Sequence, residues 1–193
     1  MHAKTGKSHA LNRSPIVIEA YDAAWPRQFR AERRRLQKLL QPGAPLTRHI
    51  GSTAVPGLPA KPIIDIMLGF RSPRALNRAL TVLRQAGYCY RPEYESVIAE
   101  RRFLTVARDG DEYNIHAIMA FGNFWFERLL FRDCLRTRRD VAHAYCELKH
   151  HLALRFRCDR SGYSNAKTDF IADVIHDRQL RFCVNRLTEG QAG

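Results

Sequence analysis

The chain has 193 residues, of which 45% are hydrophobic and 26% charged, values ordinary for one soluble globular domain. No apolar run reaches the roughly 18 residues of a membrane-spanning helix, and no CxxC pair occurs among the five cysteines, which argues against a zinc site or a disulfide framework. The net charge of +13 favours anionic ligands in general, without saying which, because the arginines are spread along the whole chain.

The first segment, residues 1–14, is polar and basic and has no apolar stretch that could serve as a signal sequence. We expect a disordered tail here, and a cytoplasmic protein with reduced thiols. The run Ile16–Ile18 predicts a short strand. Trp25-Pro26 then opens an amphipathic helix of about four turns, which ends before Pro42-Gly43.

The next elements are a short strand, a long loop and a second strand. A strand at residues 47–50 runs into Gly51-Ser52, and the proline-rich segment 53–62 predicts a loop. Residues 63–70 are the strongest strand in the sequence, short, apolar and bounded by breakers. Its alternation places Asp65, Met67 and Gly69 on one face and Ile64, Ile66 and Leu68 on the other.

Ser72-Pro73 marks the start of a helix, with the serine as N-cap, and Gly87 marks its end. Residues 103–106 and 113–119 predict two antiparallel strands, joined by a hairpin turn at Asp109-Gly110.

The remainder of the chain is helical in pattern. One helix is predicted at residues 124–135, a second follows a capping box formed by Thr137 and Asp140, and a third covers about 165–182. Strands mixed with helices followed by helices alone predict an α+β fold with a mixed sheet. We expect one domain at residues 15–187, with a sheet core at 15–121 and C-terminal helices at 122–187.

The clearest chemical signal lies between the two strands at the centre of this pattern. A Gly51-Ser52 turn lets backbone N–H groups approach an anion, and the hydroxyls of Ser52 and Thr53 add donors to phosphate oxygens. Lys61 supplies positive charge at the far end of the loop. Asp65 on the next strand can offer a carboxylate to Mg²⁺, which would bridge to the phosphates.

The segment His49–Ile66 resembles the signature of the GrpB-like family, which belongs to the nucleotidyltransferase superfamily. The likeness covers most of the chain. Further motifs that carry it, in matching order, are Tyr21–Pro26, Tyr113–His116, Phe131–Arg136, Glu147–Lys149 and Tyr163–Phe170.

The resemblance implies a mixed sheet with packed helices, extended here by C-terminal helices. Active superfamily members carry Gly-Ser, two carboxylates separated by one residue and often a third carboxylate on a later strand. These hold two Mg²⁺ ions and transfer a nucleoside monophosphate to an acceptor hydroxyl. In this chain Asp65 matches the first carboxylate, Met67 occupies the second position, and His116 is the candidate at the third. Asp65 and His116 are thus the predicted catalytic residues, with Asp65 as the metal ligand.

Four later cations are candidates for the same phosphate site. Arg132 and Arg136 are four residues apart and share one helix face, while Lys149 and Lys167 lie on separate later helices. The family motifs imply that they converge on the nucleotide, and the alternative is that they are solvated helix surface.

Three functional hypotheses remain open. The first is a Mg²⁺-dependent nucleotidyltransferase-like enzyme with an unknown acceptor. The second is a non-catalytic nucleotide-binding accessory module, because Met67 is a poor Mg²⁺ ligand. The family domain is known fused to dephospho-CoA kinases, which suggests a link to coenzyme A metabolism. The third, prompted by the net charge, is a nucleic-acid binder, although the aromatic-rich basic motif of an RNA-recognition module is missing.

Overall fold

The computed structural model describes residues 15–96 and 98–177. In this part of the chain a five-stranded mixed sheet is surrounded by five α-helices, followed by a helical segment at residues 168–177. The predicted α+β class is therefore confirmed. The tail predicted at 1–14, and the last ten residues of the domain predicted at 15–187, lie outside the described residues.

The sheet has the order β1-β2-β5-β4-β3, with β2 and β5 parallel and every other pair antiparallel. The strands are β1 (Leu46–Ile50), β2 (Ile63–Phe70), β3 (Cys89–Tyr90), β4 (Arg102–Arg108) and β5 (Asp111–Met119). β2 has the bounds that its apolar run predicts, and the two-residue β3 was not predicted. The register of the central pair sets Asp65 opposite Asn114 and Met67 opposite His116.

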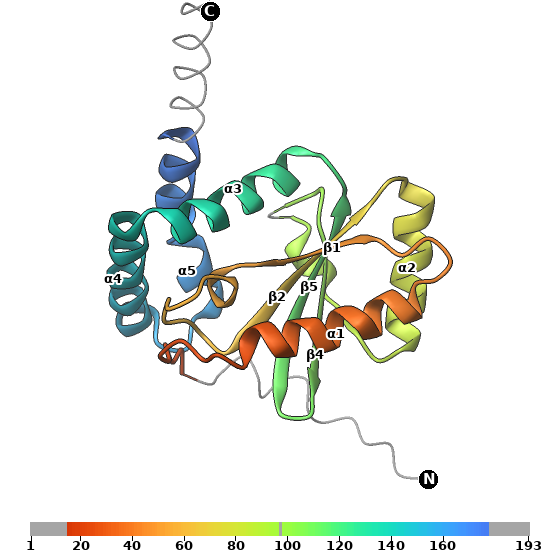
Figure 1. The fold of residues 1–193 in the computed structure, drawn as a ribbon, viewed down its shortest axis with the longest axis horizontal. Helices are drawn as coiled ribbons and strands as arrows, with labels where there is room; N and C mark the ends of the chain where they lie inside the picture. Colours follow the sequence, from red (N-terminus) through yellow and green to blue (C-terminus); the bar gives the residue numbers. More distant parts are fainter. Residues whose placement is uncertain (1–14, 97, 178–193) are drawn as a thin grey trace, which may run out of the picture.

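One face of the sheet is the main apolar core. Helices α1 (Trp25–Leu39) and α2 (Pro73–Gln85) pack on the side chains of Ile64, Ile66 and Leu68. In Figure 1, α1 runs across the front of the sheet and α2 lies at its right. The alternation predicted for β2 is confirmed, because each of these three side chains is at most 1% exposed within this core. This face is mainly apolar packing, and its buried Glu32 is hydrogen-bonded by Tyr88.

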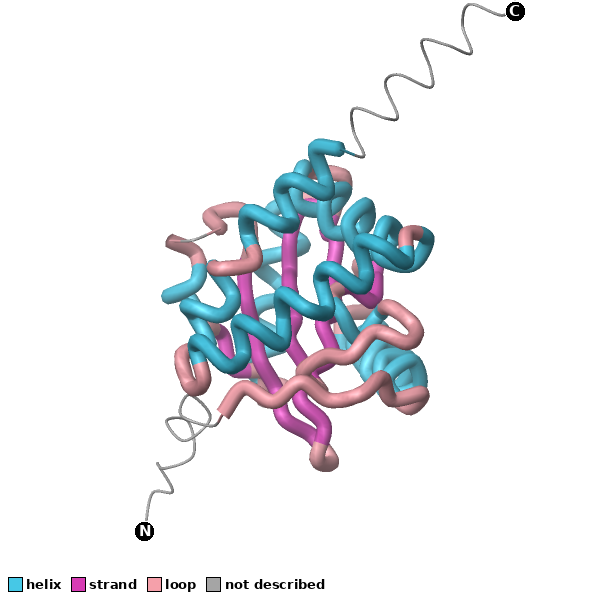
Figure 2. The backbone as a smooth tube through the Cα atoms, turned by 90° about the vertical axis from the view of Figure 1, so that its left-hand side faces the viewer, coloured by secondary structure: helices cyan, strands magenta, loops and turns pink. Residues whose placement is uncertain are grey.

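The opposite face carries Asp65, Asn114 and His116 and is covered by the C-terminal helices. α3 (Asn123–Thr137) packs Phe124 and Trp125 on Met67 and Ile118. α4 (Arg139–Phe156) and α5 (Arg160–Asn165) lie on the left in Figure 1, beside the loop that follows β1. Figure 2, seen from the α4 and α5 side, shows helices crossing in front of the strands. A polar strip of the sheet is thus enclosed by helices that come later in the sequence.

Two short-range signals act as the sequence predicts. The Ser72 hydroxyl accepts a hydrogen bond from the Ala75 N–H at 3.3 Å and caps α2. Asp109 and Gly110 have φ of 53° and 89°, the left-handed pair that a tight two-residue hairpin between β4 and β5 requires. The local chemistry of these turns is sufficient to decide their conformation.

Three local predictions are wrong. Residues 16–18 form no strand, and pairing there is limited to an isolated bridge between Glu19 and Ala60. The Thr137 hydroxyl donates back to the carbonyls of Asp133 and Cys134 in α3, so it ends that helix and does not cap α4. The helix expected from about 165 starts at 168, because α5 and a turn at 166–167 precede it.

Candidate functional site

The turn after β1 sits directly on the carboxylate of β2. Ile50 pairs with Asp65 across the two strands, so the next residue, Gly51, lies beside the aspartate. Gly51 has a φ of 71°, and a Cβ built on it would lie 2.3 Å from Asp65 Oδ2. Glycine is required here for its backbone conformation and for this close approach. The turn and the carboxylate that the sequence assigned to one pocket do lie together.

Asp65 is held by two neighbours on β5. Its Oδ1 accepts from Asn114 Nδ2 at 2.9 Å and lies 3.3 Å from His116 Nε2, and the side chain is 27% exposed. Burial acts to raise the pKa of the carboxyl, but the hydrogen bond and charge of His116, the Asn114 hydrogen bond and the charge of Lys167 together lower it. Asp65 is therefore an ionised carboxylate whose Oδ1 is already hydrogen-bonded.

The partners of His116 define its tautomer. Arg101 Nη1 lies 3.5 Å from Nδ1, and a guanidinium can only donate, so Nδ1 accepts and Nε2 carries the proton that faces Asp65. Burial lowers the pKa of His116 and the charges of Arg101 and Arg128 lower it further, while Asp65 opposes them. His116 is thus a neutral imidazole oriented by Asp65.

The position of Met67 decides what metal chemistry the site can support. Met67 is fully buried against Ile118, Phe124 and Trp125 and has no place at a solvated metal. Within residues 15–96 and 98–177 no three His, Cys, Asp or Glu side chains gather as metal ligands. Asp65 alone supplies a carboxylate beside Gly51, so the donor set does not fit the two-ion clamp that shared carboxylates normally hold.

Thr53 and His49 fasten the loop to the sheet. The buried Thr53 hydroxyl donates to the Ile63 carbonyl at 3.2 Å and lies 3.1 Å from His49 Nε2. The His49 ring stacks on Phe29 with centroids 4.6 Å apart, and burial lowers its pKa to about 4. The Thr53 hydroxyl is therefore engaged inside the protein, and phosphate binding by Thr53, predicted from the sequence, would have to come from its backbone.

The three predicted lysines meet beside the loop, and we refer to Lys61, Lys149 and Lys167 as the lysine cluster. Lys167 Nζ lies 4.0 Å from the centroid of the Tyr163 ring and Lys61 Nζ lies 5.8 Å from it. Lys149, only 2% exposed, donates from Nζ to the Pro59 carbonyl and lies 5.1 Å over the ring of Tyr145. The end of the loop that precedes β2, helix α4 and the turn after α5 thus each bring one lysine to the same region of the protein.

Burial dominates the electrostatics of the lysine cluster. It lowers the pKa of Lys167 to about 7, with Lys61, Lys149 and Arg128 adding to the shift and Asp65 opposing it. Burial likewise lowers the pKa of Lys61 to about 8, with Arg160 adding to it, and that of Lys149 to about 8. An anion bound beside these lysines would offset both the cost of burying their charge and the repulsion between them, and would raise their pKa values again.

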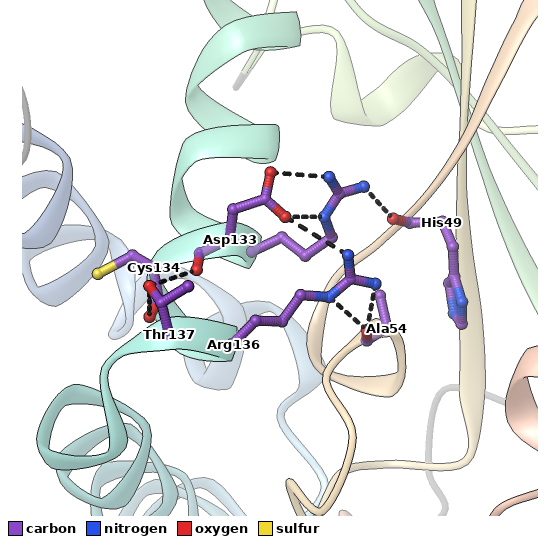
Figure 3. Close-up of polar contacts among 7 residues, drawn as sticks. His49, Ala54, Asp133, Cys134, Arg136 and Thr137 are labelled. Carbon is purple, nitrogen blue, oxygen red and sulfur yellow. Dashed lines mark hydrogen bonds and ion pairs between the residues drawn. The ribbon is translucent and has the colours of Figure 1, made fainter.

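Arg132 and Arg136 have a different environment, and with Asp133 we call them the arginine clasp. Arg132 donates from Nη1 to the His49 carbonyl at 3.0 Å and pairs with Asp133 through Nε and Nη2. Arg136 donates twice to the Ala54 carbonyl, at 2.7 and 3.1 Å (Figure 3). These donors hold the two ends of the Gly51–Thr53 turn, so phosphate binding by the two arginines stays a prediction.

Sequence reasoning missed four residues around Asp65. The ammonium groups of the lysine cluster lie over the rings of Tyr145 and Tyr163. Burial raises the pKa of Tyr145 to about 12, and the Ser52 hydroxyl acts to lower it. Each tyrosine stands four residues before its lysine, a repeated spacing that could have revealed the pair. Arg101 and Arg128, the other two, belong to no motif recognised in the sequence, although Arg128 is four residues before Arg132.

A search of the described residues finds no helix with the length and apolar character needed to cross a membrane. The family profile described as GrpB protein matches residues 15–177. A UPF0157 protein of Pseudomonas aeruginosa is 36% identical over 166 residues, which cover 83% of this chain and 66% of that protein. The crystal structure of GrpB from Enterococcus faecalis superposes with a TM-score of 0.72 at 28% identity, covering 86% of this chain and 99% of that one.

A protein of Mycolicibacterium paratuberculosis named dephospho-CoA kinase is 34% identical over 190 residues. The match covers 85% of this chain but 46% of the kinase, so this chain spans about half the length of that relative. Its share of the Pseudomonas relative is also slightly under two thirds.

Proposed function

The chain belongs to the GrpB protein family, and from this premise we propose that it is a nucleotidyltransferase-like protein that binds a nucleoside triphosphate or a related phosphorylated ligand. The observation that carries the proposal is the meeting of three lysines from separate elements beside the Gly51–Ser52 turn and Asp65. Buried like charges destabilise one another unless an anion lies between them. A phosphate group is the ligand that this arrangement suits best.

The turn adds neutral donors to these charges. Gly51 brings the backbone close to Asp65, and the hydroxyl of Ser52, the next residue of the turn, acts on Tyr145 of α4. Phosphate oxygens placed over this turn would face backbone N–H groups on one side and ammonium groups on the other. This mixture of fixed dipoles and charges is typical of phosphate sites, and it binds the anion without a metal.

Mg²⁺ would enter this site with the ligand. Asp65 supplies one carboxylate, of which Oδ1 is engaged by Asn114 and His116, and Met67 cannot replace the second. We therefore expect the phosphates themselves to provide most of the oxygens around any bound ion. No part of the proposed binding depends on Mg²⁺.

Equilibrium binding of each nucleoside triphosphate and of dephospho-CoA, with Mg²⁺ and with EDTA, tests this proposal. Dephospho-CoA is included because of the name of the mycobacterial relative. We expect saturable binding of at least one of them in EDTA. The isosteric change Asp65→Asn removes a negative charge that repels phosphate, so affinity in EDTA should stay equal or increase.

The Asp65→Asn variant also separates two modes of binding. If the phosphates bound chiefly through a metal held by Asp65, this variant would lose affinity in Mg²⁺ and behave as wild type in EDTA. Lys38→Met, a change at an exposed lysine of α1, is the matched control and should leave binding unaltered. Absence of saturable binding to every compound of the panel would refute the proposed function.

A second candidate function, nucleotidyl transfer, is favoured by the contact between Asp65 and His116. Asp65 orients the imidazole so that the lone pair of Nδ1 faces away from it, toward Arg101. An acceptor hydroxyl that attacks the α-phosphorus would take the place of Arg101 at Nδ1 and lose its proton to this nitrogen, and pyrophosphate would leave. Sustained pyrophosphate release that His116→Asn abolishes would support this activity, and release unaffected by that change would exclude it.

A further inference from the structure

We propose that Arg101 and Arg128 form a second anion subsite beside His116, and that one oligophosphate chain extends from this subsite to the lysine cluster. The inference rests on the proposed function and deepens it, since it specifies a chain of several phosphates as the bound group. Neither arginine belongs to any motif or site assigned from the sequence. Both are placed by β4, its preceding loop and α3 on the face of the sheet that carries Asp65.

A stack of rings places the two guanidinium groups. The His116 ring lies between Phe103 and Phe124, with centroid distances of 5.2 and 6.2 Å. The guanidinium carbon of Arg101 lies 4.8 Å from the Phe103 centroid, and that of Arg128 lies 4.7 Å from the Phe124 centroid. Each arginine is thus held flat against an aromatic ring that also flanks His116, which fixes its orientation before any ligand binds.

The polar atoms of these arginines are poorly satisfied. The Nε atoms of Arg101 and Arg128 are buried and have no hydrogen-bond partner within residues 15–96 and 98–177. Over the same residues the Arg128 side chain forms no hydrogen bond or salt bridge, not even with the adjacent Glu127. The Arg101 side chain has one such contact, at 3.5 Å from His116 Nδ1. Buried polar groups are nearly always hydrogen-bonded, so two interacting guanidinium groups whose Nε atoms both lack a partner favour a bound anion at this position.

The two arginines and the lysine cluster surround Asp65 from different elements. The charge of Asp65 attracts Arg101, Arg128, Lys61 and Lys167, and the charge of Arg128 lowers the pKa of Lys167. Burial lowers the pKa of Arg101 to about 10, and repulsion by Arg128 is the next contribution. Lys149 and Arg160 add to this charge through Lys167 and Lys61, so cations outnumber the three described carboxylates that act on the group, Asp65, Glu112 and Glu127.

This excess of charge argues for more than one phosphate. The arginines stack on Phe103 and Phe124, whereas the lysines stack on Tyr145 and Tyr163 of α4 and α5. Because the two sets of cations lie over rings of different elements, a single phosphate group would contact only one set. A planar guanidinium fork suits two oxygens of one phosphate, and an ammonium suits a single charge at the other end of the chain.

Calorimetric titration with orthophosphate, pyrophosphate and tripolyphosphate in EDTA, at constant ionic strength, tests the inference. Tripolyphosphate should bind wild type at least about tenfold more tightly than orthophosphate, since each additional charge-assisted hydrogen bond strengthens binding by a factor of about ten or more. Arg101→Gln and Arg128→Gln should each remove most of that difference and leave orthophosphate affinity within about twofold. Arg128→Lys should retain an intermediate preference for tripolyphosphate, because it keeps the charge but loses the fork.

The controls distinguish failure of this inference from failure of the proposed function. Arg155→Gln removes a guanidinium that also lies over a ring, 5.3 Å from the Phe156 centroid, on exposed α4 surface, and should leave every affinity unchanged. Thermal unfolding of each variant verifies folding. Tripolyphosphate affinity unchanged in both glutamine variants would overturn the subsite and leave the lysine site standing. No binding of any phosphate compound to wild type would overturn both.

A nucleoside triphosphate titrated in parallel distinguishes two sources of the same chemistry. Affinity equal to that of tripolyphosphate would mean that the site recognises the chain alone. Tighter binding of the nucleotide would mean that the nucleoside also contacts the protein. In both cases Arg128→Gln should weaken binding of the nucleoside triphosphate by the same factor as binding of tripolyphosphate. If Arg128→Gln left the affinity for the nucleoside triphosphate unchanged, the proposal would be contradicted.

Discussion

The arginine clasp and the lysine cluster look alike in the sequence but have different partners in the structure. Each consists of cations on late helices that the family resemblance directs to a phosphate. In the arginine clasp the donors reach the His49 and Ala54 carbonyls and Asp133. In the lysine cluster Lys149 also reaches a backbone carbonyl, that of Pro59, but the ammonium groups of Lys61 and Lys167 lie over the Tyr163 ring, and burial is the chief cause of their lowered pKa values.

This difference separates cations that stabilise the fold around a site from cations that are available to bind a ligand. A cation whose donors are engaged by backbone carbonyls stabilises the apo protein, and its loss leaves acceptors unsatisfied. A buried cation with few partners destabilises the apo protein and becomes favourable only when an anion arrives. Stability and ligand affinity should therefore respond in opposite ways to substitutions in the two groups.

The largest expected effect is on affinity, from Lys167→Met. Because Lys167 contributes charge to the phosphate and little to the fold, affinity for the tightest-binding triphosphate should fall about ten- to a hundredfold. The free energy of unfolding should be unchanged or higher, since a buried charge is removed. Titration calorimetry and urea denaturation measure the two quantities, with Lys38→Met as control. A large loss of stability would place Lys167 with the structural cations.

The next effect is on stability, from Arg132→Met. The Arg132 side chain is 13% exposed, and its loss removes a charged donor from the His49 carbonyl, while Asp133 keeps its contact with Arg136. The free energy of unfolding should fall by about 2 kcal/mol, the typical penalty for partners left without a charged donor. Arg139→Met, at an exposed position of α4, should change it by less than about 0.5 kcal/mol. Equal values for the two variants in urea denaturation would mean that the clasp does not hold the loop.

The smallest effect is a pH dependence that the lysine cluster alone should produce. The pKa of Lys167 falls from 10.5 to about 7 on folding, so between these values the unfolded chain binds more protons and the free energy of unfolding rises with pH. Lys61 and Lys149, with pKa values near 8, act in the same direction. Up to about pH 9 guanidinium groups stay protonated and add little slope, although Arg101, whose pKa burial lowers to about 10, would add to it at higher pH.

Thermal unfolding of the ligand-free protein from pH 7 to pH 9, below the range in which Arg101 and the buried tyrosines titrate, measures this dependence. We expect the melting temperature to rise by a few degrees in wild type and by less in Lys167→Met. Phosphate affinity should move the other way and weaken above about pH 8, because the ammonium groups lose their protons. A melting temperature with the same pH profile in both proteins would show that Lys167 is not the titrating group.

Short-range patterns were sufficient for most of the fold. The apolar run of β2, the Ser72 cap and the Asp109-Gly110 turn are decided by a few neighbouring residues, and each was predicted correctly. Prediction was wrong where a distant partner competes, as at residues 16–18. There the chain contacts Ala60 through Glu19 alone, and it is packed under α4 and α5 by Ile16.

For the candidate site, the sequence by itself determined the face of β2 that carries Asp65, and the family resemblance implied Gly51 and His116 as its neighbours. The strand register, which sets Asn114 opposite Asp65, came from the structure. Only the tertiary structure decided which cations are engaged and which are free to meet a ligand. That choice depends on carbonyls and rings from other elements, such as Ala54 for Arg136 and Phe124 for Arg128. The sequence shows which residues are charged, but the groups that these residues contact are determined by how the chain folds.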